Sequence, residues 1–305
     1  MTDVPVVIGV PVASSAVGHF AWSEGYRRAN SPGKLSLPRN ESSSPEYISA
    51  ARLDWLRERL SERDLAVARD VARVRLVTGE QLERLHFADL SPASRAVVRR
   101  RVLGRLVNWR VLATFERRIG GARAGSAGLT YALDVAGQRL TASDARARRP
   151  SLPGVRYVRH VLAVSETYVS LVCAARQDEL RLDAFEAEPA CWWPDGRGGV
   201  LKPDAYAAVG AAAHTDHWWI EVDLSTEHLP TLKRKLMTYA DFWRRGQLGP
   251  DETMPRVLVT VLTTERYSDV VRLIRQLPAE SEKLFVVSVA KDATRTIVRC
   301  LNESD

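Results

Sequence analysis

The order of apolar segments in the second half is the feature that most constrains the fold of this chain. A helical pattern comes first, then three β-type runs with no helix between them, then two more strands that each follow a helix. The helices are expected at 160–176, 229–244 and 267–276, and the strands at 180–188, 200–209, 217–224, 256–262 and 283–289. This order, αβββαβαβ, predicts an α/β domain with a mixed sheet.

The first half has strong local signals for helix ends. Apolar residues at helical spacing from 50 to 76 predict two helices that are broken near Ser61. Thr78 is a natural N-cap for the next helix, because Gln81 stands at the reciprocal position of a capping box. Ser91 followed by Pro92 predicts the start of a further helix, which ends near residue 109.

A strand, a glycine-rich turn and a return strand follow that last helix. The strands are expected at 111–115 and 129–133, and the tip between them is basic. Short helices, one arginine-rich helix and a basic hairpin together predict a winged helix-turn-helix. The fold class expected for the whole chain is therefore α+β.

Positive charge is concentrated on this helix and hairpin. The chain has a net charge of +7, and residues 95–123 contain nine arginines and one acid. Val98, Val102, Leu106 and Trp109 are expected to face inward. The expected contacts to double-stranded DNA are Arg95, Arg99, Arg101 and Arg105 on the helix and Arg117, Arg118 and Arg123 on the hairpin. The competing interpretation is a solvated basic surface on an interaction domain.

Composition suggests four segments. Residues 1–48 are rich in Ser and Pro and are expected to be an irregular extension, 49–140 the winged helix, 141–154 a polar linker, and 155–305 the second domain. The three cysteines lie far apart without a CxxC pair, which favours a reducing compartment and argues against a zinc site. No apolar run approaches 18 residues, so we expect no membrane association and a cytoplasmic protein.

Three acidic residues in the predicted strands suggest a metal site. Asp204 follows Pro203, and Glu221 and Asp223 lie on the next strand, where alternation places both with Trp219 on one face. The opposite face, with Trp218 and Ile220, is expected to meet the core. Adjacent carboxylates repel unless a cation or protons neutralise them, and hard divalent ions such as Mg²⁺ or Mn²⁺ prefer oxygen ligands.

The helix expected at 229–244 carries two further candidates. Lys235 and Tyr239 are four residues apart and therefore lie side by side. A lysine at this position could reach the carboxylates and stabilise charge on a phosphate that is being cleaved. The plainer interpretation is that Lys235 is a solvated helix lysine and that the acids pair with neighbouring basic residues. His160 is interpreted as a core or capping histidine.

The pattern P-D, E-x-D, T-E and K-x-x-x-Y resembles the replication-relaxation family of actinobacterial and plasmid proteins. The resemblance covers about residues 60 to 280 and extends to the winged-helix segment. It implies a restriction-endonuclease-like αβββαβ core of the PD-(D/E)xK nuclease superfamily and a relationship to MOBC-type relaxases, which start conjugative transfer. It also implies that Asp204 and Glu221 bind metal, and that Lys235 and Tyr239 match the helix position that holds a Gln-x-x-x-Tyr pair in some nuclease branches. Glu166, Glu188, Lys202 and Glu227 are additional candidates.

The chain departs from the superfamily pattern at Asp223, where a lysine usually follows the glutamate by two residues. Catalysis would then need a lysine from elsewhere, with Lys235 the best candidate and Lys202 the second. Two hypotheses follow. One is a metal-dependent endonuclease that nicks the origin of a plasmid or integrative element, with conjugation or replication proteins as partners. The alternative is a non-catalytic DNA-binding regulator of replication or copy number, and an adaptor that binds only protein is a weaker third.

Overall fold

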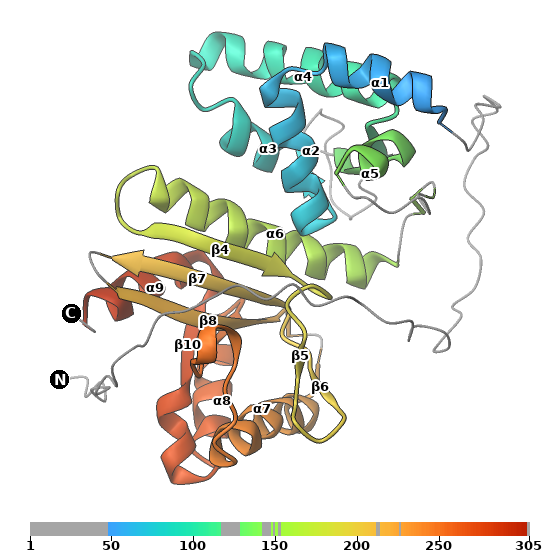
Figure 1. Cartoon of the computed structure of the whole chain (residues 1–305). Coiled ribbons are helices and arrows are strands. Elements are labelled where there is room, and N and C mark those ends of the chain that lie inside the picture. The colour runs from blue at the N-terminus through green and yellow to red at the C-terminus, as the bar shows by residue number, and fades with distance from the viewer. Residues whose placement is uncertain are drawn as a thin grey trace.

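The computed structural model describes residues 48–116, 129–141, 148, 150–151, 154–211, 214–225 and 227–303. A group of N-terminal helices lies against a layered part in which helices cover both faces of a sheet (Figure 1). The irregular extension expected at the N-terminus and the tip of the expected hairpin lie outside the described residues, apart from Ile48.

The N-terminal part alternates helices with three short strands. Its elements are α1 (Ala50–Arg59), α2 (Glu62–Val74), β1 (Val77–Thr78), α3 (Gly79–His86), α4 (Pro92–Asn108), β2 (Leu112–Glu116), β3 (Leu129–Leu133) and α5 (Val135–Thr141). The strands form an antiparallel sheet in the order β1-β3-β2. The hairpin partners expected from the sequence therefore pair, and α5 is an element that the sequence analysis did not predict.

Side-chain caps fix where these helices begin, as the sequence indicated. Ser61 starts α2 with a capping box, and Thr78 and Gln81 form the reciprocal capping box of α3. Ser91 accepts a hydrogen bond from the backbone N–H of Ser94, and Pro92 occupies the first turn of α4.

Five strands form the central sheet of the second part. They are β4 (Arg181–Ala187), β7 (Ala205–Ala211), β8 (His214–Asp223), β9 (Arg256–Val261) and β10 (Phe285–Val289), in the order β10-β9-β8-β7-β4. The strands β8, β9 and β10 pair in parallel, whereas β7 is antiparallel to both of its neighbours, β4 and β8. The mixed sheet expected from the sequence is confirmed. The strand expected at 200–209 is divided, because Pro203 has no N–H to donate to a ladder and separates β6 (Val200–Leu201) from β7.

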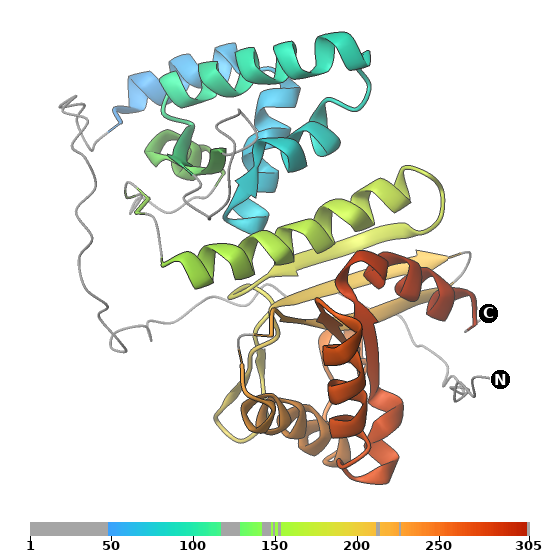
Figure 2. The same cartoon turned by 180° about the vertical axis from the view of Figure 1, so that it is seen from behind.

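Helices cover both faces of this sheet (Figures 1 and 2). One face packs against α6 (Val155–Ala175) and α9 (Ala293–Asn302), and the other against α7 (Leu229–Arg244) and α8 (Thr264–Ile274). A small hairpin of β5 (Trp193–Pro194) and β6 lies beside α7. The helix α7 has the predicted bounds, and α6 begins five residues earlier than expected. The helix α9 was not predicted, although Ala293, Ile297, Cys300 and Leu301 form a buried apolar face at helical spacing.

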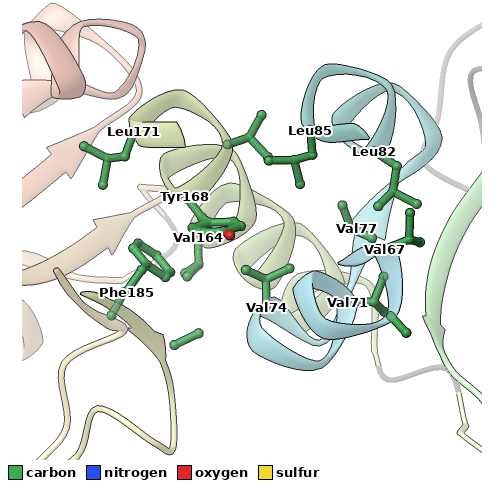
Figure 3. Close-up of a cluster of buried hydrophobic side chains, with 14 of the residues drawn as sticks. Val67, Val71, Val74, Val77, Leu82, Leu85, Val164, Tyr168, Leu171 and Phe185 are labelled. Atoms are coloured by element: carbon green, nitrogen blue, oxygen red, sulfur yellow. The ribbon is translucent and has the colours of Figure 1, made fainter. Parts of the chain in front are cut away.

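The core continues from the N-terminal helices into the sheet. Figure 3 shows Tyr168 and Leu171 of α6 between valines and leucines of α2 and α3 on one side and Phe185 of β4 on the other. Among the described residues, α6 is the one helix that could span a membrane by length and composition, and 56% of its apolar window is buried inside the protein. Its side chains are used in this packing, as in the core helix of a globular fold.

Candidate active site at the edge of the sheet

Two acidic residues meet across β7 and β8. Ala205 pairs with Ile220, so Asp204 stands opposite Glu221 at the edge where β7 begins. The backbone N–H of Asp204 donates to the carbonyl of Ile220 at 3.0 Å, and the N–H of Val222 donates to the Asp204 carboxylate at 2.7 Å. These contacts fix the carboxylate of Asp204 against the neighbouring strand.

The helix α7 adds a lysine and a tyrosine to this pair. The ammonium of Lys235 contacts the carboxylate of Glu221 and lies 3.3 Å from Oδ1 of Asp204. One turn later, the Tyr239 hydroxyl donates a hydrogen bond to the other carboxylate oxygen of Glu221. The structure thus brings together Asp204, Glu221, Lys235 and Tyr239, which we call the acid–lysine cluster.

His160 reaches the same cluster from the opposite face of the sheet. Its Nε2 lies 3.3 Å from Oδ1 of Asp204. Asp204 is therefore held between a histidine of α6 and a lysine of α7, so side chains from both helical layers meet at this edge. Sequence reasoning missed this role, because nothing in the local pattern around His160 shows that an aspartate 44 positions later will contact it.

Burial and charge set the protonation of the cluster. The Glu221 side chain is 2% exposed, and this burial raises its pKa to about 8 although Lys235 opposes the shift. For Asp204, burial acts to raise the pKa, but the hydrogen bond with His160 and the charge of Lys235 bring it below its usual range. For Lys235, burial acts to lower the pKa, but the two carboxylates outweigh it and hold the lysine charged.

Tyr239 is buried and stays protonated. Its side chain is packed against Trp219, with ring centroids 5.5 Å apart, and only 1% of the residue is exposed. Burial raises the pKa of its hydroxyl well above the usual value, and the neighbouring charge of Glu221 acts in the same direction. The hydroxyl is therefore a hydrogen-bond donor to Glu221 at neutral pH.

Asp223 lies on the same face of β8 but does not join the cluster. Its carboxylate forms an ion pair with Arg266 at 2.6 Å and accepts a hydrogen bond from the backbone N–H of Ser225 at 2.7 Å. It makes no hydrogen bond or ion pair with the four cluster residues. The expectation that the face with Trp218 and Ile220 meets the core is confirmed, and the face with Trp219 is buried as well.

The additional candidates are engaged elsewhere. Glu188 forms an ion pair with Arg75 at 2.7 Å, and its backbone N–H donates to the carbonyl of Asp204 at 3.0 Å. Lys202 lies over the ring of Trp192, 4.7 Å from its centroid. Glu166 pairs with Arg84, and Glu227 is exposed.

The cluster offers two oxygen ligands to a divalent ion. The carboxyl groups of Asp204 and Glu221 face one point, and the ammonium of Lys235 occupies that point. Carboxylates that meet in this way suit a hard cation such as Mg²⁺ or Mn²⁺, provided that water completes the ligand shell and the lysine moves aside. In the described part of the chain, no group of three or more His, Cys, Asp or Glu side chains is placed to hold a metal ion.

The arginines of α4 divide into two groups. Arg99 pairs with Glu83 at 2.7 Å, and Arg105 binds both carboxylate oxygens of Asp64 at 2.7 Å. The guanidinium of Arg95 donates to two carbonyls of the α3–α4 turn at 3.0 and 3.1 Å. Arg101 is exposed, as is Arg100, which the sequence analysis did not select. Arg117, Arg118 and Arg123 lie outside the described residues.

The inward side of α4 also differs in part from the expectation. Leu103 and Leu106 are buried, whereas Val98, Val102 and Trp109 are only half-buried. Leu103 was not expected to face inward. The inward stripe is therefore rotated slightly from the predicted one, which is consistent with the internal contacts of Arg99 and Arg105.

The fold and this site define a class: an α+β protein with a mixed five-stranded sheet and a buried acid–lysine cluster at the sheet edge. The chain belongs to the replication-relaxation family, whose family model matches residues 69–257. The match runs from α2 to the start of β9 and includes every residue of the cluster. No curated protein and no solved structure matches the chain. Membership indicates a DNA-processing role related to replication.

Proposed function

We propose that this protein binds double-stranded DNA at the origin of a plasmid or integrative element and nicks one strand at the acid–lysine cluster, acting in the cytoplasm. The observation that carries the proposal is the meeting of Asp204, Glu221 and Lys235 in one place. They come from two strands and a helix, and their convergence supplies both the acids and the replacement lysine that a PD-(D/E)xK-type nuclease site requires.

The N-terminal topology supports the DNA-binding half of the proposal. The order α2, β1, α3, α4, β2, β3, with strands arranged β1-β3-β2, suits a winged helix-turn-helix in which α4 enters the major groove. The exposed face of α4 carries Arg100, Arg101, Gly104 and Asn108. A side chain at Gly104 would meet nothing within 4 Å, so this face is open to a close approach by DNA. Arg100 and Arg101 thus replace Arg99 and Arg105 as candidate contacts.

Within the cluster, the side chains have separable roles. Asp204 and Glu221 would hold Mg²⁺ or Mn²⁺, which when bound activates water and offsets charge on the scissile phosphate. Lys235, held charged beside both acids, would stabilise the negative charge that develops as the phosphodiester bond breaks. His160 and Tyr239 are positioning residues, because each contacts one carboxylate and fixes its orientation.

The core topology is consistent with this assignment. The elements α6, β4, β7, β8, α7 and β9 follow one another in the order αβββαβ, if the small β5–β6 hairpin is set aside as an insertion. Asp204 immediately precedes the second of these strands, and Glu221 lies on the third. Asp223 is held in an ion pair with Arg266 and is not replaced by a lysine. The lysine of the site is therefore Lys235 of the following helix.

A second candidate function is a DNA-binding regulator of replication or copy number without catalysis. One observation favours it: Lys235 already contacts both Asp204 and Glu221, so both carboxyl groups have a partner without a metal ion. In that case the cluster would be a buried ion-pair network that orders the sheet edge. The two functions agree on DNA binding and differ on metal and cleavage.

The test is a nicking assay on supercoiled plasmid that carries the candidate origin, with Mg²⁺ or Mn²⁺. We expect open-circular product from the wild type, and a loss of about 100-fold or more in rate for Asp204→Asn, Glu221→Gln and Lys235→Met. The matched control is Glu179→Gln, which removes an exposed carboxylate from the turn after α6. Circular dichroism checks that each variant is folded.

Calorimetric titration with Mn²⁺ separates the two functions. Binding that disappears in Asp204→Asn supports the nuclease. A wild type that shifts origin DNA, binds no Mn²⁺ and leaves every plasmid supercoiled would establish the regulator instead.

A further inference from the structure

A cleft of about 570 Å³ lies between the N-terminal helices and the sheet. Its walls come from α3, from the first half of α6 and from the residues that follow β8 and β9. Gln81 and Arg84 line it on the side of α3, and Leu224 and Leu262 line it on the side of the strands. The cleft is thus formed only where the two parts of the protein meet.

Two unengaged arginines project from α6 at this cleft. Arg156 and Arg159 are one helical turn apart and exposed, and neither makes a hydrogen bond or ion pair within the described part of the chain. The third arginine, Arg84, is paired with Glu166, and Glu80 is the other acid of the lining. The lining of the cleft therefore carries more positive than negative charge, and Arg156 and Arg159 have no ionic partner among the described residues.

Two residues of the cleft lining are close in sequence to residues at the acid–lysine cluster. Arg159 immediately precedes His160, whose Nε2 lies 3.3 Å from the carboxylate of Asp204. On the strand side, Leu224 immediately follows Asp223, two residues beyond Glu221. The helix turn that carries Arg159 into the cleft therefore also places His160 against Asp204.

We propose that this cleft binds the phosphodiester backbone of a single DNA strand and leads that strand to the cluster. The inference rests on the proposed function and adds the path of the strand to it. Arginines bind phosphates well because the guanidinium matches their geometry and is always charged. Leu262, which is 51% exposed, offers an apolar surface to the face of a base.

The size of the cleft selects a single strand over a duplex. Its volume is in the range of roughly 300–1,000 Å³ that is typical of small-molecule pockets. Such a space admits a few nucleotides of one strand. A B-DNA duplex is too wide to enter it, because its major groove alone measures about 12 Å across. The duplex would remain on the open face of α4, and a strand separated from it would enter the cleft.

The test is the salt dependence of binding to a fluorescein-labelled dT₁₂ oligonucleotide, measured by fluorescence anisotropy in EDTA. For a single strand, each neutralised phosphate contributes about 0.7 to the slope of log K against log salt. We expect Arg156→Ala/Arg159→Ala to lower the magnitude of this slope by about 1.4. The control, Arg272→Ala/Arg295→Ala, removes two arginines that are 70% and 86% exposed on α8 and α9, and should leave the slope unchanged.

Three results would overturn the inference: equal slopes for the wild type and the α6 variant, an equal reduction in the control, or an equal loss of slope with a duplex probe. The readout is independent of cleavage. If the wild type binds dT₁₂ through Arg156 and Arg159 but never nicks plasmid, the inference about the cleft holds and the proposed nuclease activity fails. If the wild type nicks plasmid but the slope is unchanged in the α6 variant, the proposed nuclease activity holds and the inference about the cleft fails.

Discussion

Glu221 is a buried carboxyl whose proton uptake should control how the stability of this protein depends on pH. Burial raises its pKa from an ordinary 4.5 to about 8. Between these two values, the folded protein binds one proton more than the unfolded chain. The free energy of unfolding should therefore fall as the pH rises, by up to about 1.4 kcal/mol for each pH unit.

The substitution Glu221→Gln isolates this contribution. Glutamine keeps the size of the side chain and can still accept the hydrogen bond from Tyr239, but it does not titrate. From pH 5 to pH 8 the wild type should lose about 3.5 kcal/mol of unfolding free energy relative to the variant, because the folded state is protonated at Glu221 below pH 8. The stabilisation by protonation is complete below the unfolded pKa and is lost as the pH rises through the folded one.

The assay is urea unfolding at pH 5, 6, 7 and 8 in EDTA, followed by tryptophan fluorescence. Trp219 is buried beside Tyr239 and should report the loss of the cluster. Other titrating groups are shared by the two proteins and cancel in the difference. Glu179→Gln shows what the removal of one exposed carboxylate does by itself.

A constant difference between the wild type and Glu221→Gln across this pH range would refute the reasoning. It would mean that Glu221 is ionised in the folded protein even at pH 5. The cluster would then be a permanent ion pair with Lys235, and the influence of burial on the glutamate would be smaller than that of the lysine.

Substitutions at three further positions test other contacts, each by its effect on the free energy of unfolding in urea. Asp64 is 1% exposed and binds Arg105, so Asp64→Asn removes a buried charge from this ion pair. The variant should lose about 3 kcal/mol of unfolding free energy. Phe185→Ala empties a fully buried site between α6 and the sheet and should cost about 3–5 kcal/mol, while Phe185→Leu should cost much less. Asp223→Asn leaves Arg266 without its buried partner and should also cost about 3 kcal/mol, but the variant should still bind Mn²⁺ if Asp223 is not a ligand.

Local signals in the sequence predicted much of the fold. The caps at Thr78 and Ser91 depend on residues within three positions of each other, so they are visible without a structure. The strand at 129–133 and the helix at 229–244 have the predicted bounds. The mixed sheet followed from the order of strands and helices, which restricts how strands can pair.

Part of the candidate site was also predictable. Alternation placed Glu221 and Asp223 on one face, and helical spacing placed Lys235 beside Tyr239. What could not be predicted were partners distant in the sequence. Asp223 is paired with Arg266, which lies 43 residues later on another helix. His160 reaches Asp204 across the sheet edge only because the chain folds back between them.

The same reason explains the arginines of α4. A helical pattern shows which residues share a face, but it does not show which face meets a neighbouring acid. Arg99 and Arg105 are drawn inward by Glu83 and Asp64, which belong to other helices. Their charge could be counted from the sequence, but their availability to DNA depends on packing.

The continuous core through α6 has a consequence for how proteins of this kind change their target. Because α6 packs against α2 and α3 on one side and the sheet on the other, the N-terminal helices and the sheet share one hydrophobic core. Under the proposed function, this shared core would place the nick at a constant number of base pairs from the sequence bound by α4. Exchange of the N-terminal helices between relatives would then fail unless α6 were transferred with them.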